Sequence, residues 1–289
     1  MYLAKVSKKL IKLSLLALIL SFLPTYAFAH GDNCFVPTMA IDEPTVGDEL
    51  DMFFASTKNR EEEGDTTHSQ GFGMEISKVI FPHFGVSVGT NYKRLRLADS
   101  FNSGFDNVEV GAKYEFYTDH DQNFLLSAGL IAEIGGTGRH QIGAHSHTAI
   151  APVLYFGKGM ANLSEDYKYI RPLVFTGMLS PSYCTGARKF ENIELGLTVQ
   201  YHLRNLDHDA AYYEFWNYVI PLVELPLKMG TAHECRGKIV GTVNPGVLLS
   251  GKYMQVGLEA TIPINKRSGS HVGALVQLHF FLDNMFNCW

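Results

Sequence analysis

The sequence predicts an exported all-β protein, a transmembrane antiparallel up-and-down β-barrel of about twelve strands. Three observations predict this fold. Residues 1–29 have the form of a secretory signal peptide, and the rest of the chain alternates apolar and polar residues over long runs. After residue 29, no apolar stretch approaches the twenty or so residues that a membrane-spanning helix needs.

The signal peptide is predicted from its three regions. Four lysines open the chain, residues 13–23 are apolar, and Ala27-Phe28-Ala29 supplies the small-x-small cleavage site. Cleavage there leaves residues 30–289 as one outer-membrane barrel domain, in which residues 30–47 are expected to be a periplasmic N-terminal segment. We therefore expect an exported protein rather than a cytosolic enzyme.

The charge of the remaining chain argues against nucleic-acid binding. The whole chain has 24 basic and 29 acidic residues, and residues 1–29 hold four of the basic ones and none of the acidic ones. Without them 20 basic residues face 29 acidic ones, which gives a formal net charge of −9. A nucleic-acid binder needs a basic surface, and the sequence contains no basic cluster of that kind.

The alternation has the period of two that β-strands produce. In residues 107–116 the even positions are apolar or aromatic, whereas the odd ones are Asn, Glu, Gly, Lys and Glu. Residues 192–203 and 254–262 repeat the pattern. The predicted strands are 48–58, 68–80, 84–97, 105–118, 123–136, 147–159, 170–182, 190–203, 217–228, 238–250, 252–264 and 271–282. A short helix is expected within 210–216.

Two environments give rise to such alternation, a soluble β-sandwich and a membrane barrel. A sandwich would place Lys, Thr and Asp on the polar face, but here Gly, Gln, Asn, Glu and His dominate it. The apolar rows are long and end in Tyr and Phe, which is typical of a barrel with lipid outside and aromatic girdles at both interfaces. The sequence therefore favours the membrane barrel.

Two stretches carry a resemblance to a known group of proteins. They are residues 42–50, with the sequence DEPTVGDEL, and the end of the chain, with QVGLEATIPIN at 255–265 and QLHFFLD at 277–283. In these stretches the chain resembles the outer-membrane β-barrel transporters and porin-like proteins of Gram-negative bacteria, in particular the meta-pathway phenol-degradation-like barrels. The resemblance implies an outer-membrane location, insertion by the barrel-assembly machinery and passive transport of a small solute, and it supplies no catalytic residue.

Polar side chains on the inward parity are the candidate functional residues, because a charge facing lipid near mid-membrane costs about 2–4 kcal/mol. They are Glu75, Glu109, Lys113, Glu115, Glu133, Glu194, Gln200, His202, Gln255, Glu259, Gln277 and His279. Two interpretations remain open. These side chains line a wet, cation-favouring passage, or they pair with Lys113 and arginines to fill the barrel with a hydrogen-bonded plug.

The four cysteines are expected in an oxidising compartment, where disulfides form. The twelve-strand order places Cys184 and Cys235 in outer loops, and Cys34 and Cys288 on the periplasmic side. Of the three possible pairings, only Cys184 with Cys235 and Cys34 with Cys288 crosses no membrane. Four unpaired thiols remain the alternative, because sequence alone gives no Cα separation.

Histidines and serines raise two further possibilities. His140, His145 and His147 share one glycine-rich loop, but their spacing matches no closed metal site, so solvated loop histidines are the preferred interpretation and no cofactor is expected. Ser77, Ser87 and Ser127 lie on the inward parity without a Gly-x-Ser-x-Gly motif, so no enzyme activity is expected. The sequence therefore predicts a passive channel, with a non-conducting surface-binding barrel and, third, a barrel lipase as alternatives.

Overall fold

The computed structural model describes residues 35–60, 66–97, 100–186, 189–206, 214–231 and 237–286. The predicted signal peptide at 1–29 lies outside these residues. Within them, no helix combines the length and apolar character required to cross a bilayer.

Thirteen strands account for most of the described chain. They are β1 Glu49–Arg60, β2 Thr66–Phe81, β3 Phe84–Leu97, β4 Ser100–Phe105, β5 Val108–Asp119, β6 Phe124–Ile134, β7 Ala149–Gly159, β8 Leu173–Cys184, β9 Lys189–Tyr201, β10 Val219–Gly230, β11 Ile239–Ser250, β12 Met254–Pro263 and β13 Gly273–Phe281. The short helices are η1 His140–Ile142, η2 Glu165–Tyr167, η3 Leu203–Asn205, η4 Glu214–Tyr218 and α2 Leu282–Phe286.

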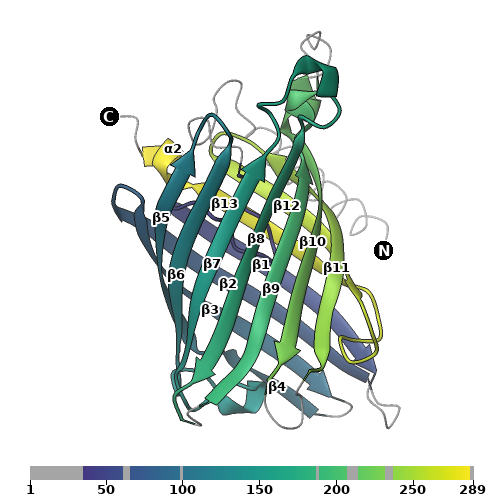
Figure 1. Cartoon of the computed structure of the whole chain (residues 1–289). Helices are drawn as coiled ribbons and strands as arrows, with labels where there is room; N and C mark the ends of the chain where they lie inside the picture. The colour runs from purple at the N-terminus through teal and green to yellow at the C-terminus, as the bar shows by residue number, and fades with distance from the viewer. Residues whose placement is uncertain are drawn as a thin grey trace.

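The strands form one closed antiparallel barrel (Figure 1). Each strand pairs with its neighbours in the chain, and β1 closes the wall by pairing with both β13 and β2. The short strand β4 pairs with the far part of β3 and β5 with the near part, so these two share one position and the wall has twelve. The predicted fold class is therefore confirmed.

The split between β4 and β5 is the main departure from the predicted strands. The sequence predicted one strand over 105–118, but the ladder breaks at Asp106 and Asn107. Asn107 is buried and its amide nitrogen donates to Glu133 Oε1 at 2.7 Å and to the His145 carbonyl at 2.8 Å. These contacts lie on neighbouring segments, which a local alternation pattern does not reveal.

The two faces of the wall differ as the alternation predicts. Outward side chains such as Phe72, Met74 and Ile76 on β2 are each more than 40% exposed. On the inward parity, Gln200, Gln255 and His279 are completely buried. An apolar outer surface around a polar interior is the arrangement that a barrel in lipid requires.

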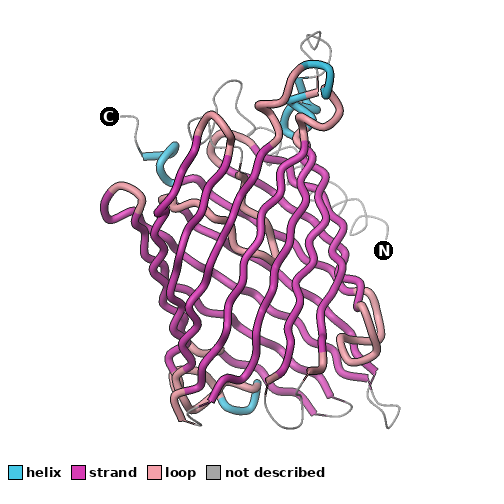
Figure 2. Tube along the Cα trace, in the orientation of Figure 1, coloured by secondary structure: helices cyan, strands magenta, loops and turns pink. Residues whose placement is uncertain are grey.

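One end of the barrel has both tight turns and long connections. The end that carries α2 (the α2 end) has the tight turns 82–83, 120–123 and 251–253, and His83 and Asn123 adopt positive φ values of 65° and 46° there. The longer connections 160–172 and 202–218 emerge at the same end (Figure 2). In place of the short helix expected at 210–216, η4 occupies Glu214–Tyr218; residues 207–213 are outside the described chain. The opposite end, where β4 lies, is called the β4 end below.

Candidate functional site

The barrel interior is occupied by residues 35–48, here called the lumen segment, which precede β1. It enters at the α2 end, where Phe35 packs on Leu125 and Val174, each the second residue of its strand. It reaches Glu224, the sixth residue of β10, and returns to the α2 end, where Asp48 Oδ1 accepts a hydrogen bond from the Val79 amide at 2.7 Å. The segment is therefore a loop that dips to mid-barrel and returns to the same end.

Three glutamines hold the first part of this loop. The side-chain amides of Gln200, Gln255 and Gln277 donate to three consecutive carbonyl oxygens, those of residues 36–38, at 2.9, 2.8 and 3.1 Å. The glutamines come from β9, β12 and β13, so three separate strands contribute. Because a buried carbonyl without a partner is costly, these bonds satisfy the extended backbone of the segment.

The deepest part of the loop is held by Glu224. Its carboxylate is fully buried and accepts the backbone N–H groups of Ala40 at 2.8 Å and Ile41 at 3.1 Å. Without Glu224 the Ile41 N–H group would be buried without a partner, which is costly. Glu224 therefore accepts hydrogen bonds from N–H groups of the segment, whereas the three glutamines donate hydrogen bonds to its carbonyl oxygens.

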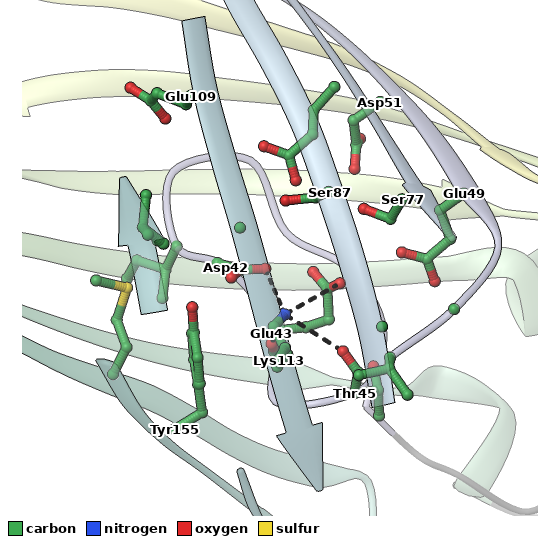
Figure 3. A pocket seen from close by; sticks show the side chains of 18 of the residues that line it. Asp42, Glu43, Thr45, Glu49, Asp51, Ser77, Ser87, Glu109, Lys113 and Tyr155 are labelled. Atoms are coloured by element: carbon green, nitrogen blue, oxygen red, sulfur yellow. Dashed lines mark hydrogen bonds and ion pairs between the residues drawn. The ribbon is translucent and has the colours of Figure 1, made fainter. Parts of the chain in front are cut away.

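Lys113 holds the returning part (Figure 3). Its ammonium group donates to Asp42 Oδ1 at 2.9 Å and to the carbonyl oxygens of Glu43 at 2.7 Å and Thr45 at 3.3 Å. Burial raises the pKa of the Glu43 carboxyl well above its ordinary value, and Lys113 opposes that rise. Further along, the Ser127 hydroxyl donates to the Pro44 carbonyl, and the Val46 amide donates to Glu115 Oε1 at 2.7 Å.

Glycines on the inward parity make room for the segment. A Cβ atom added at Gly157 would lie 2.6 Å from the Phe35 ring. One at Gly196 would lie 2.8 Å from Ile41, and one at Gly257 would lie 2.8 Å from the Met39 side chain. The polar rows are rich in glycine for a steric reason, since larger side chains there would push the segment away from the wall.

This arrangement differs from the expectation that residues 30–47 form a periplasmic segment. Residues 35–47 lie inside the barrel, and residues 30–34 are outside the described chain. Eight strands enclose an interior that side chains alone fill, and a twelve-strand barrel is wider, so its interior has room for such a segment. Alternation identifies which wall residues face inward, but it contains no information about which segment meets them.

A cavity of about 320 Å³ remains between the lumen segment and the wall. Its lining contains six carboxylates and one lysine, namely Asp42, Glu43, Glu49, Asp51, Glu75, Glu109 and Lys113. Tyr155 adds an aromatic wall (Figure 3), and Met178 also lines the cavity. The excess of carboxylates gives the cavity a negative potential, which attracts cations and repels anions.

The predicted lumen residues divide into those that meet at the cavity and those that do not. Glu75, Glu109, Lys113 and Gln277 line it, and His279 Nδ1 lies 2.9 Å from Asp51 Oδ2 beside it. Glu115, Gln200 and Gln255 contact the lumen segment.

The others lie apart from the cavity. Glu133 accepts from Asn107, Glu194 pairs with Lys228 at 2.8 Å, and Glu259 is buried over Gly246. His202 follows β9 and contacts Gln200 Oε1, and burial lowers its pKa to about 3, so its ring is neutral.

Sequence reasoning missed Glu224, Asp42 and Asp51. Glu224 lies between Pro221 and Pro226, which obscured the alternation of β10, although its even position matches the inward parity of that strand. Asp42 precedes the first strand, where no parity exists to be read. Asp51 was inside a predicted strand and could have been found from its parity.

Cysteines and histidines do not form a site within the described residues. Cys184 has a free, buried thiol at the end of β8; its predicted partner Cys235, like Cys34 and Cys288, lies outside the described residues, so both bridges remain predictions. No three His, Cys, Asp or Glu side chains of the described chain meet as metal ligands. His140, His145 and His147 therefore share the β6–β7 connection without forming a joint metal site.

Comparison with known proteins gives similarity in structure only. No protein-family model and no curated protein matches the sequence. Among solved structures, an outer-membrane channel from Pseudomonas putida F1 superposes with a TM-score of 0.56 at 10% identity, over 85% of this chain and 98% of that one. The NanC porin gives 0.49 at 11% identity and the KdgM porin 0.47 at 16%, each over 80% of this chain and 98% of the other.

The superposition on the Pseudomonas putida channel covers nearly all of that protein, so the likeness concerns the whole barrel rather than a part of it. At this identity it establishes the fold alone. The resemblance to porin-like outer-membrane barrels of Gram-negative bacteria, which the sequence indicated, is thereby confirmed at the level of the fold.

Proposed function

We propose that the chain is an outer-membrane channel for passive passage of small solutes, and that the lumen segment closes it at rest. The observation that carries this proposal is how the segment is held. Side chains of the wall bind it through single hydrogen bonds and ion pairs. No strand pairing among the described residues includes residues 35–48.

Each of these contacts has a replacement in water. The three glutamines, Glu224 and Lys113 are polar, so a lumen from which the segment has left would be lined by groups that hydrate well. A segment paired in a β-ladder would instead leave unpaired wall strands behind. The wall is therefore suited to two states, one with the segment bound and one with water in its place.

The charge of the cavity suggests which solutes pass. Four wall carboxylates and two carboxylates of the lumen segment face a single lysine, Lys113, in the cavity, and rings of acidic side chains favour cations in channels. Preference for small cations or cationic solutes is accordingly part of the proposal. In the same proposal, residues 1–29 direct export, the barrel-assembly machinery inserts the chain, and the α2 end faces the periplasm.

Planar-bilayer recording of the refolded protein tests this function. Two proteins are compared: the chain from residue 30 onward, and the same chain without residues 35–46. This deletion leaves β1 intact, because β1 begins at Glu49. We expect rare openings from the first and sustained, cation-preferring conductance from the second. Absence of conductance from the shortened chain, with a folded barrel shown by heat-dependent gel mobility, would sink the channel proposal.

The filled lumen favours one other function, a non-conducting barrel that serves as a surface-binding or structural element. In that case the lumen segment is a permanent part of the interior. The same recordings separate the two functions, because a permanent core predicts that removal of residues 35–46 destabilises the barrel without opening it. Thermal unfolding of both chains supplies the second measurement.

A further inference from the structure

The outer face of strands β1–β4 carries three rows of side chains that run across the strands. The row furthest from the β4 end is aromatic, and the two rows nearer to the β4 end contain basic residues. The first row is aromatic and consists of Phe54, Phe72, Tyr92 and Phe105, which are paired in register across the four strands. These rings are 38–59% exposed. Aromatic rows of this kind mark the interface between hydrocarbon and headgroups.

The two rows beyond the aromatic one contain basic residues. Two residues further along, Gln70 pairs with Arg94 and Arg94 with Ser103; four residues further, Lys58 pairs with His68 and His68 with Arg96. Lys58, His68, Arg94 and Arg96 are all exposed on the same outward parity as the aromatic residues. We call these four residues the basic ladder.

The depth of the basic ladder follows from strand geometry. At about 3.3 Å per residue, it lies about 7–13 Å beyond the aromatic row along the strands, and less along the membrane normal because barrel strands tilt. The headgroup layer on each side of a bilayer is about 5–8 Å thick. The basic ladder is therefore at the level of lipid headgroups.

The charges of the basic ladder have no acidic partner among the described residues, and the cross-strand arrangement brings them together. Lys58 and Arg96 flank His68 on neighbouring strands, and Arg94 lies two residues from Arg96 on the same strand. By contrast, Lys93, which lies between Tyr92 and Arg94 and points to the inward face of β3, forms an ion pair with Asp106. Arg94 lies 4.5 Å from the centroid of the Phe101 ring, which orients its guanidinium along the surface while leaving its N–H groups available.

We propose that the basic ladder binds the phosphate groups of an anionic lipid headgroup in the membrane leaflet at the β4 end, while the acyl chains of that lipid pack below the aromatic row. Arginine forms bidentate hydrogen bonds with phosphate, and two arginines two residues apart present such groups on one face. A bound phosphate would also supply the negative charge that these side chains lack among the described residues. This site lies on the lipid side of the wall and is independent of the lumen and its proposed function.

A lipid-binding measurement on the refolded chain tests this inference. The probe is diphosphorylated lipid A in mixed micelles, with bound lipid counted by native mass spectrometry. The test variant is Arg94→Gln/Arg96→Gln, and the matched control is Lys266→Gln/Arg267→Gln, which removes two exposed charges from the connection 264–272 at the same end. At about 1 kcal/mol per basic residue near a membrane surface, we expect the test variant to bind roughly ten- to thirtyfold more weakly, and the control to bind as the wild type does.

Further arms make the result specific. Arg94→Lys/Arg96→Lys keeps the charge and should retain most of the binding, which separates loss of charge from misfolding. Lipid A without phosphates should bind weakly to all variants, and millimolar inorganic phosphate should not displace the intact lipid. Equal loss in the test and control variants, equal binding of the phosphate-free lipid, or displacement by inorganic phosphate would each overturn the proposal.

Discussion

The proposed closing of the channel by the lumen segment can be measured with one substitution, at Lys113. In Lys113→Met the side chain keeps its length but loses the ammonium group, and with it the bonds to Asp42 and to the carbonyl oxygens of Glu43 and Thr45. Only the closed state contains these bonds, because all three partners belong to the lumen segment. The substitution should therefore shift the equilibrium towards the open state.

The size of the shift can be worked out from the contacts. The Asp42 side chain is 39% exposed, so its ion pair contributes little after solvent screening. The two carbonyl bonds come from a charged donor whose side chain is only 16% exposed, and the one to Thr45 is long at 3.3 Å, so together they are worth about 2–3 kcal/mol. At 1.4 kcal/mol per factor of ten, the ratio of closed to open channels falls roughly 30- to 150-fold.

Single-channel recording detects a shift of that size. If wild-type channels are open for about 0.1% of the time, Lys113→Met channels should be open for several per cent. Lys158→Met is the control, because Lys158 donates to the Gln122 carbonyl in a turn and has no bond to the lumen segment. An unchanged open fraction in folded Lys113→Met protein would refute the reasoning that side-chain bonds keep the segment in place.

Three other predictions concern the same interior. The pKa of Glu43 is raised above its ordinary value of 4.5 in the closed state, so Glu43 binds its proton more tightly there. Raising the pH from 4.5 through this raised pKa should therefore progressively favour opening. Glu43→Gln should flatten the pH dependence of the open fraction, and an unaltered profile would contradict the prediction. Gly157→Val should displace Phe35 and raise the open fraction about tenfold or more, because burying such a ring is worth about 1.5–3 kcal/mol, whereas Gly157→Ala should have a smaller effect. In the chain lacking residues 35–46, Glu75→Gln/Glu109→Gln should lower the cation preference measured from reversal potentials, and an unchanged reversal potential would exclude a role for these carboxylates.

Much of the wall was predictable from sequence because lipid imposes a strict rule on it. A strand in a bilayer cannot place charges outward near mid-membrane, so each run of alternation fixes both the strand and its inward residues. The positions of Glu75, Glu109 and Gln277 followed from this rule. Arg94 and Arg96 place charges on the outward parity of β3, but they lie beyond the aromatic row, where the rule no longer applies.

The interior was less predictable because its contacts are non-local. The bond from Gln277 to Thr38 joins residues 239 positions apart, and the bond from Gln255 to Pro37 joins residues 218 apart. No periodicity reports such a pairing. The two interpretations of the lumen that the sequence left open, a wet passage and a hydrogen-bonded plug, meet in the structure as a cavity beside a bound segment.

The loop shape of the lumen segment has a mechanical consequence. Both of its ends lie at the α2 end, so the segment can leave the barrel without being threaded through it. A pull on the chain ahead of Phe35 would load the contacts one at a time, first the Phe35 ring and then the glutamine bonds to residues 36–38, as a zipper opens. Contacts broken in sequence resist far less force than contacts sheared together, so a weak pull from the side of the α2 end would be sufficient to withdraw the segment.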